Sequence, residues 1–499
     1  MNVDSMNGLG PSESGTRKTA TLVDTNFESI PVTKIFAEFV ANLTYESIDP
    51  NVVQNLKRLL LDFVGIAPYS GSYIESSEAF YRAINAFSGA GSCTVFTKGQ
   101  GLLPHYAALL NAAYSHTLDF DDTFADGALH PGASVIAAAL TQAEVSGVGG
   151  RALMTGLAAG YEVICRLSRA LGAGAYERGF HNTGTAGVFG AVAAIMKVKG
   201  ASAAAIEAAF GFAGSKAAGS QQFLENGAWN KRLHPGFAAH DAFLCQAFVE
   251  QGVPTAKKSL EGIFGFLKGY SSSPEIGNMV DGLGVQWIHL KTAIKPYPGC
   301  RMTHTGIDLA EKWRKAKTVP IKSLRLSLSP HCWMIVGRPL SNKIHPKNTV
   351  DAQFSAYYQL AVAWLDGNGT GWNPYDRFHD DDISAVTDRI TVDAMEDLHA
   401  LAGRLKMHWQ DGTTTVDVET DRIGEASNPY SDEQLLKKFK SLSIPAYREQ
   451  RSDEIANTIA VVEQCNNVKD LMSLLASDTV SIYFTFLLFS GRDWQKRQR

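Results

Sequence analysis

The stretch His116-Thr-Leu-Asp-Phe-Asp-Asp-Thr-Phe-Ala-Asp-Gly-Ala-Leu-His-Pro-Gly132 places acids, a hydroxyl and two imidazoles between apolar segments with helical spacing. Gly127 and Pro131-Gly132 supply the turn chemistry that lets a backbone reverse direction between two helices. Aspartates beside a helix commonly form a capping turn at the surface, and the same residue types also build catalytic sites. The stretch alone leaves both interpretations open.

Helical periodicity surrounds this stretch. Asp49-Pro50 marks a helix start, residues 65–71 interrupt the pattern, and residues 102–115 lead directly into the stretch. Residues 93–97 form the one short strand expected in this half. Small residues such as alanine and glycine allow close helix packing. Helices rich in them are expected at 133–144, 151–171, 188–198 and 201–219.

The pattern changes near residue 286. Alternating apolar and polar residues predict strands at 287–294, 323–329, 390–393 and 414–419. Helical spacing is found between them and again near the end of the chain, at 303–316, 351–364, 431–440 and 454–475. The predicted fold class is therefore mainly α, with a large all-helical domain and an inserted smaller α+β domain. The predicted boundaries are a disordered tail at 1–30, a helical domain at 31–285 plus 421–480, an α+β domain at 286–420 and an atypical tail at 481–499.

Composition limits the class of protein. The 499 residues suffice for two domains, and a charged content of only 19% favours a surface hidden in a homodimer. A net charge of −4 argues against a nucleic-acid partner, and no window reaches the roughly 18 apolar residues of a membrane span. Six scattered cysteines without a C-x-x-C pair indicate reduced thiols in an intracellular protein, cytoplasmic or mitochondrial.

Three further loops combine glycine with a histidine or a cation. They contain His181, the pair Lys231-Arg232, and His304. Each has an ordinary interpretation, because a loop histidine is usually at the surface and a Lys-Arg pair is usually solvated. Repetition of the arrangement in loops that interrupt one apolar body favours a shared site, and pockets commonly form where domains meet.

Other chemistries lack their sequence signals. The chain has no G-x-x-x-x-G-K-[S/T], no G-x-G-x-x-G between a strand and a helix, and no G-x-S-x-G in a hydrolase context. No H-x-x-x-H or H-E-x-x-H spacing supports a metal site through His130 and His181. The remaining set of histidines, cations, an aspartate and a threonine suits proton transfer on an anionic substrate.

Five motifs occur in a fixed order between residues 33 and 476: Leu118-Asp-Phe-Asp-Asp-Thr with His130-Pro, Gly-Phe-His181-x-Thr-Gly, Trp229-Asn-Lys-Arg-Leu-His-Pro-Gly236, Lys295-Pro-Tyr-Pro with His304, and Arg338-Pro339 with Asp351-Ala-Gln-Phe-Ser355. Together they resemble the MmgE/PrpD family, which includes 2-methylcitrate dehydratase, fungal alkylcitrate dehydratases and cis-aconitate decarboxylase. The end of the chain, from Tyr483, matches no part of the family pattern. The resemblance implies a helical first domain, an inserted α+β lid domain, a homodimer, and a pocket between the domains that works without metal or organic cofactor.

The resemblance also implies which residues form the pocket. His130 and His181 would be the acid/base pair, and Lys231 a third catalytic residue. The substrate would be a small tricarboxylate, whose carboxylates would meet Lys231 and protonated histidines through charge-assisted hydrogen bonds worth about 1.5–3 kcal/mol each. The further substrate-binding residues would be Asp119, Thr123, Arg232 and His304.

Three functions follow as alternatives. The leading one is a cofactor-independent lyase that dehydrates a citrate-like acid, most simply a 2-alkylcitrate such as 2-methylcitrate, by removing a proton and protonating the leaving hydroxyl. The second is a cis-aconitate decarboxylase producing itaconate, in which the same histidines protonate carbon as carbon dioxide leaves. The third is a non-catalytic binding protein that keeps the fold.

Overall fold

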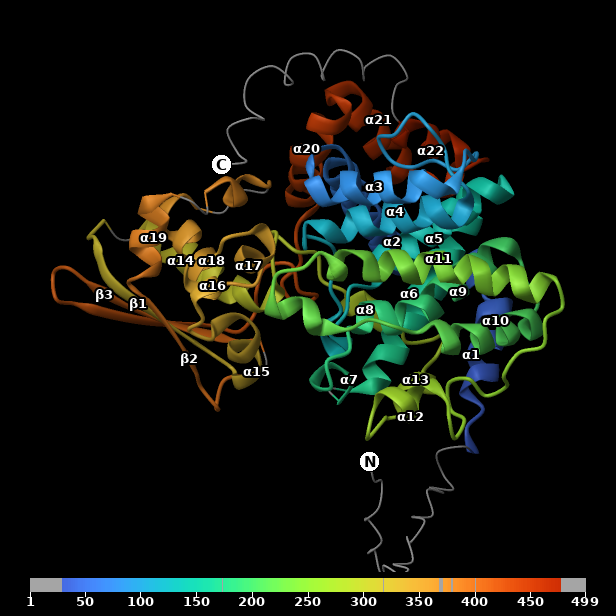
Figure 1. The fold of residues 1–499 in the computed structure, drawn as a ribbon, viewed down its shortest axis with the longest axis horizontal. Helices are drawn as coiled ribbons and strands as arrows, with labels where there is room; N and C mark the ends of the chain where they lie inside the picture. The colour runs from blue at the N-terminus through green and yellow to red at the C-terminus, as the bar shows by residue number, and fades with distance from the viewer. Residues whose placement is uncertain are drawn as a thin grey trace, which may run out of the picture.

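The computed structural model of the protein describes residues 29–476, except 173, 317, 368–370, 378–379 and 400. The expected tails at 1–30 and 481–499 lie outside the described residues, apart from Ser29 and Ile30. Most of the described chain is helical and its named strands form one four-stranded sheet, which confirms the mainly α class. Figure 1 shows the long helices stacked as one body, with the sheet-containing part beside it.

The helical body is built from the first part of the chain and from its last described helices. Its core is one large cluster of buried apolar residues, to which both segments contribute. The long helices of the first segment are α1 (Val32–Asn42), α2 (Pro50–Tyr73), α3 (Glu75–Ser88), α4 (Pro104–Thr117), α5 (Pro131–Ser146), α6 (Gly150–Leu171), α9 (Gly187–Lys199), α10 (Ala203–Lys216) and α11 (Asn230–Glu250). Its short helices are α7 (Gly174–Glu177), α8 (Asn182–Thr185), α12 (Phe266–Tyr270) and α13 (Gly277–Val280), and the last helices are α20 (Asp432–Tyr447), α21 (Glu449–Ala460) and α22 (Lys469–Leu475).

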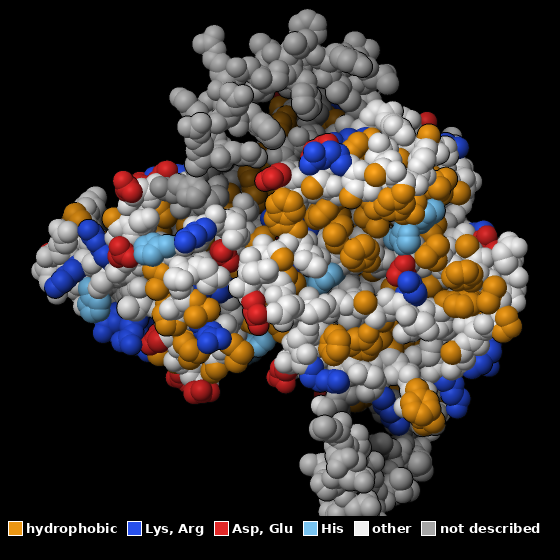
Figure 2. Space-filling model, viewed as in Figure 1, with side chains coloured by type: hydrophobic (Ala, Val, Ile, Leu, Met, Phe, Trp, Pro, Cys, Tyr) orange, Lys and Arg blue, Asp and Glu red, His pale blue; other side chains and the backbone are white. Residues whose placement is uncertain are grey.

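One face of this body carries exposed aromatic side chains. Phe87 on α3 and Phe237 and Phe248 on α11 are 65%, 51% and 47% exposed. Figure 2 shows apolar side chains gathered over the part of the helical body where α3, α4 and α11 lie. Large apolar groups left in contact with water in this way commonly mark an interaction surface.

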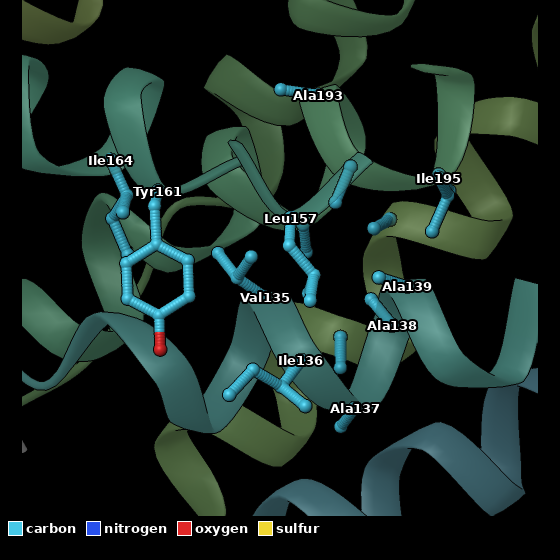
Figure 3. Packing of buried hydrophobic residues seen from close by; sticks show 14 of the residues in the cluster. Val135, Ile136, Ala137, Ala138, Ala139, Leu157, Tyr161, Ile164, Ala193 and Ile195 are labelled. Carbon is cyan, nitrogen blue, oxygen red and sulfur yellow. The ribbon is translucent and has the colours of Figure 1, made fainter. Parts of the chain in front are cut away.

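Glycine allows the central helices of the body to approach closely. A Cβ atom added at Gly160 on α6 would lie 2.9 Å from the carbonyl oxygen of Gly190 on α9 and 2.6 Å from Cγ1 of Val135 on α5. Figure 3 shows the alanines and small branched side chains of the same three helices filling the space between them. The close packing predicted from the alanine and glycine content is therefore found here, between α5, α6 and α9.

Helix α2 corrects one prediction. It continues without a break through residues 65–71, where an interruption was expected. The glycines in this segment serve packing between helices: an added Cβ would lie 3.1 Å from the ring of Phe439 at Gly65 and 3.0 Å from the ring of Tyr114 at Gly71. A glycine signal in the sequence cannot distinguish a turn from such a contact.

The second part of the molecule contains the sheet, in the order β2-β1-β3-β4. Strand β1 pairs in parallel with β2 and antiparallel with β3, and β3 pairs antiparallel with β4. Helices α14 and α18 pack against the sheet, around a second apolar cluster. The strands are β1 (Ile321–Leu328), β2 (Ile390–Ala394), β3 (Gly403–Trp409) and β4 (Thr414–Glu419), and the helices are α14 (His304–Ala316), α15 (Pro330–Cys332), α16 (Ser341–Ile344), α17 (Thr349–Gln353), α18 (Ala356–Leu365) and α19 (Asp381–Thr387).

Two expected strands are wrong and one was missed. Residues 93–97 make only an isolated bridge, from Cys93 to Leu102. The segment 287–294 contains a 3-10 helix, because the buried carboxylate of Glu162 accepts hydrogen bonds from the backbone of Ile288 and His289 and bonds the His289 ring at 2.9 Å. The missed strand is β3, the central antiparallel partner in the sheet.

The last helices return to the helical body. Helix α20 packs on α2, where Lys438 forms a buried ion pair of 2.7 Å with Asp62 and donates to the carbonyl oxygen of Phe120 at 2.9 Å. The sheet-containing part thus lies in the sequence between two segments of one body, although the exact domain boundaries and a lid-like closure stay predictions. In the part of the chain that the structure describes, no helix has the length and apolar character needed to cross a membrane.

The glycine contact between α6 and α9 can be tested by adding one methyl group. Gly160→Ala should lower the free energy of unfolding by about 1–3 kcal/mol, because the methyl has no space between three helices. Thermal unfolding measures this loss. Gly214→Ala is the control: a Cβ there would be at least 3.6 Å from its neighbours, so stability should stay the same or rise by up to about 1 kcal/mol. Equal effects of both changes would contradict the packing role.

Candidate active site

The stretch 116–132 is a buried loop between α4 and α5. Asp119, Asp121 and Asp122 are all less than 5% exposed, so this is not a solvated surface turn. Asp122 does cap a helix, since it accepts from the backbone N–H of Gly132 at 3.0 Å and from the hydroxyl of Tyr161 at 2.7 Å. Asp122 therefore has a capping role, although not at the surface, and Asp119 and Asp121 are the acids that meet cations and histidines, while a catalytic role for the stretch stays a prediction.

Asp119 joins two lysines. Its Oδ1 lies 2.9 Å from Nζ of Lys231 and 2.8 Å from Nζ of Lys295, and Lys295 also donates to the Asp119 carbonyl oxygen at 2.9 Å. Burial opposes ionisation of Asp119, but Lys231 and Lys295 outweigh it and hold the pKa of this carboxyl well below its usual range. An aspartate held in this way positions Lys231 directly, while its expected contact with substrate stays a prediction.

The backbone of Asp119 is unusual as well. Its φ of +51° lies in the left-handed region, which only a few non-glycine residues adopt and aspartate tolerates better than most. The backbone N–H of Gly299 donates to the carbonyl oxygen of Asp119 at 2.8 Å, and Gln353 donates to that of Leu118 at 2.9 Å. The segments around Lys295 and α17 thus hold the loop in this conformation.

His130 is placed between the two acids. Its Nδ1 lies 3.3 Å from Oδ1 of Asp121 and its Nε2 lies 3.8 Å from Oδ1 of Asp119. The other oxygen of Asp121 bonds Nδ1 of His116 at 2.7 Å, and the backbone N–H of His130 donates to the hydroxyl of Thr183. Burial lowers the pKa of His130 and lowers that of His116 to about 3, although Asp121 opposes both shifts.

His181 forms a histidine pair. Its Nδ1 lies 2.9 Å from Nδ1 of His234, and its ring centre lies 6.5 Å from that of His130. One Nδ1 must donate and the other accept, so the pair cannot carry a proton on both nitrogens that face each other. Burial and the neighbouring His234 hold the pKa of His181 well below its usual range, and burial with Lys231 lowers the pKa of His234 to about 4.

The other residues expected in the site, Thr123, Arg232 and His304, make contacts of a different kind. Thr123 exchanges backbone hydrogen bonds with Ala293 at 2.9 and 2.7 Å, which joins the loop to the chain before Lys295. Arg232 donates to the Ser76 hydroxyl at 2.6 Å. His304 accepts from Nη1 of Arg301 at 2.7 Å, and burial together with Arg301 holds the pKa of His304 well below its usual range. The substrate-binding roles of Thr123, Arg232 and His304 stay predictions.

The structure therefore brings Asp119, His130, His181 and Lys231 together and adds residues that the sequence analysis did not assign. Those missed are Lys295, which bonds Asp119, and His234, which bonds His181. Each stands inside a motif quoted above, so the signal was present, but nothing in the sequence tells which member of a motif faces its neighbours in space. Burial lowers the pKa of these imidazoles in the free protein and so favours their neutral form, and the expectation that protonated histidines bind carboxylates stays a prediction.

One group has spacing that could accept a metal ion. His116, Asp121 and His130 each offer one ligand atom, and these atoms lie within 4.8 Å of one another. In the described structure these residues also contact one another, through the hydrogen bond between His116 and Asp121 and the approach of His130 to Asp121. Catalysis without a metal or organic cofactor stays a prediction from the sequence.

Comparison with known proteins places this geometry in a family. Models of the MmgE/PrpD N-terminal domain and the MmgE/PrpD C-terminal domain match residues 34–278 and 297–464. The chain belongs to the MmgE/PrpD family. The resemblance of the five motifs is thereby confirmed, and members of this family are lyases that carry out dehydration or decarboxylation.

Several relatives within the family carry one name. The cis-aconitate decarboxylase of Aspergillus terreus is 26% identical over 492 residues, which cover 92% of this chain and 98% of the relative. The cis-aconitate decarboxylases of Mus musculus and Homo sapiens are also 26% identical, over 463 and 464 residues, and each alignment covers 88% of this MmgE/PrpD chain.

Neutral buried histidines make stability depend on pH. The unfolded chain binds protons at an ordinary histidine pKa near 6.5, whereas His234 in the folded protein has a pKa of about 4. The unfolded state therefore gains protons first as pH falls, and folding stability should drop between pH 7 and pH 5. Asp122, whose pKa burial raises to about 7, acts in the opposite direction in the same window.

His234→Gln should consequently lose less stability than the wild type between pH 7 and pH 5. The measurement is the melting temperature (Tm) at both pH values. His399→Gln is the control, because His399 is an exposed histidine and its replacement should leave the difference in Tm unchanged. If His234→Gln and the wild type lost the same number of degrees, the neutral histidine pair would not be a source of acid sensitivity.

Proposed function

We propose that the protein is a lyase acting on a citrate-like tricarboxylate, and that it decarboxylates cis-aconitate to itaconate and carbon dioxide. The observation that carries the proposal is the Asp119–Lys231–Lys295 cluster beside the neutral imidazoles of His130 and His181. The printed names of the relatives favour decarboxylation over the dehydration that the sequence analysis preferred.

Charge explains the choice of substrate class. Lys231 and Lys295 bring two positive charges against one on Asp119, so these three side chains together are cationic. Lys295 already donates to the carboxylate and carbonyl oxygens of Asp119 and to the carbonyl oxygen of Gly299, which leaves Lys231 as the lysine that can meet a carboxylate. Arg232 is buried and hydrogen-bonded to a neutral hydroxyl. Each carboxylate that meets such a cation gains a charge-assisted hydrogen bond worth about 1.5–3 kcal/mol. A trianion offers enough carboxylates to engage several of these groups together.

Decarboxylation needs one proton donor. As the bond between the methylene carbon and its carboxylate breaks, the electron pair forms a new carbon–carbon double bond and carbon dioxide leaves. The original double bond shifts, and its far carbon takes a proton from an acid. His130 suits this step because Asp121, 3.3 Å away, can stabilise its imidazolium. The nearby carboxylates of a bound trianion raise the pKa of the imidazole, so the proton is taken up with the substrate.

Dehydration of a 2-alkylcitrate is the second candidate, and one observation favours it. Elimination of water needs a base as well as an acid, whereas decarboxylation needs only the acid. His181, held neutral against His234, could accept the proton from carbon while a protonated His130 delivers one to the leaving hydroxyl. The third possibility, a non-catalytic tricarboxylate-binding protein, would use the same cations without turnover.

Three substrates distinguish these functions. The purified protein should form itaconate and release carbon dioxide from cis-aconitate, with little product from 2-methylcitrate or citrate. Product analysis by chromatography and carbon dioxide release are the measurements. Unsaturated acid from 2-methylcitrate without carbon dioxide would instead support dehydration. Binding of all three acids without any product would leave only the binding protein.

The site assignment is tested by two substitutions. His130→Ala and Lys231→Ala should each lower kcat/KM by at least about a hundredfold, because one removes the proton donor and the other a buried cation. Lys291→Ala is the control, since this largely exposed lysine pairs with Asp126 at the outer edge of the same loop. Wild-type rates in either site variant would remove that residue from the mechanism. Activity should also survive a strong chelator.

We further propose that the protein is a homodimer that buries the aromatic face of α3 and α11. A charged residue on this face should prevent association, because it would be buried without a partner. Phe237→Asp is therefore expected to be a monomer, whereas Phe264→Asp, at a 95% exposed position on a loop, should keep the wild-type mass. Light scattering after gel filtration gives the masses. A monomeric wild type would contradict the proposal.

A further inference from the structure

Lys343, on α16 in the sheet-containing part, differs from the other buried lysines. It is 5% exposed, and no ion pair joins it to a carboxylate of the described residues. Buried lysines elsewhere each meet an acid at 2.9 Å or less, in the pairs Lys57–Glu463, Lys231–Asp119, Lys295–Asp119 and Lys438–Asp62. Lys343 donates instead to a neutral group, the carbonyl oxygen of Phe354, at 2.9 Å.

Phe354 places Lys343 next to the candidate active site. The ammonium of Lys343 lies 5.7 Å from the centre of the Phe354 ring, and that of Lys231 lies 5.2 Å from the same centre. The ring of Phe223 connects this pair to the histidines, since it lies 6.3 Å from Phe354 and 6.0 Å from His181. Two lysines, one from each part of the molecule, thus share one aromatic ring beside the acid/base residues.

A buried cation without an anion is costly in the free protein. Burial lowers the pKa of Lys343 to about 8, although Cys300 and Asp351 oppose the shift, and Arg338 adds to it. Polar groups that are buried at such a cost usually have a partner, and an ammonium donates three hydrogen bonds, of which Phe354 takes one. The remaining donors fit a carboxylate that arrives with a ligand.

We propose that Lys343 binds one carboxylate of the tricarboxylate ligand, so that the ligand is held between Lys231 of the helical body and Lys343 of the sheet-containing part. The inference rests on the proposed substrate class but not on which reaction follows. It adds a third lysine to the site and gives the sheet-containing part a direct contact with the ligand.

The test measures binding of a ligand that cannot react. Propane-1,2,3-tricarboxylate is saturated and has no hydroxyl, so calorimetric titration reports binding alone. Lys343→Gln should raise its Kd about tenfold to a hundredfold, because the side chain loses its charge. Lys343→Arg keeps the charge and should stay within a few-fold of the wild type. Lys347→Gln changes an exposed lysine four residues away and should bind as the wild type does.

Ligands with one carboxylate removed separate contact from structural damage. Glutarate lacks the central carboxylate and methylsuccinate lacks a terminal one. The wild type should bind both less tightly than the tricarboxylate. In Lys343→Gln the ratio of the Kd of the dicarboxylate to the Kd of the tricarboxylate should shrink at least tenfold for one of the two dicarboxylates. A purely structural lysine would weaken all three ligands equally and overturn the inference, as would a tricarboxylate Kd in Lys343→Gln equal to that of the wild type.

Failure of the inference and failure of the proposed function give different results. Turnover of cis-aconitate by the wild type, combined with unchanged ligand binding in Lys343→Gln, would overturn the role of Lys343 and leave the lyase intact. Tricarboxylate binding that depends on Lys343, without turnover of any substrate, would support the inference and overturn the lyase. Absence of tricarboxylate binding by the wild type would overturn the inference itself.

Discussion

The arrangement of the site depends on one buried carboxylate. Asp119 in its left-handed conformation gathers Lys231 from α11 and Lys295 from the segment that leads into the sheet-containing part. Without this anion two ammonium groups would face each other in a region from which water is excluded. Burying each of these charges without a partner would cost free energy. The first acid of the loop therefore joins three distant segments of the chain and sets the position of the cation proposed to meet the substrate.

The histidines follow from the same burial. Around Asp119, the lysines have a carboxylate partner, whereas burial lowers the pKa of the imidazoles and favours their neutral form near pH 7. The site of the free protein thus holds ion-paired lysines beside histidines for which burial favours the neutral form. Under the proposed function, Lys231 attracts the anion, and the bound anion then raises the pKa of the imidazole that donates the proton.

Much of the architecture could be predicted from local patterns. Helical spacing gave α2, α4 and the helices of the core, and alternation gave β1, β2 and β4. The errors arose where a distant residue decides the local conformation, as Glu162 does for the 3-10 helix at Ile288–Lys291 and Phe439 does for Gly65. The contacts of the site were likewise unpredictable where they join distant residues. Motifs identified His130, His181 and Lys231, but the pairing of Asp119 with Lys295 spans 176 residues and leaves no local pattern.

The ion pair of Lys438 with Asp62 has a consequence for synthesis on the ribosome. Asp62 and the loop carbonyl of Phe120 are made early, yet the lysine that joins them is added more than three hundred residues later. The sheet-containing part is made before α20, so the helical body receives its last helices only after the second part of the chain has been synthesised. A chain that stops before α20 lacks the ammonium that bonds Asp62 and the carbonyl oxygen of Phe120 in the loop beside Asp119.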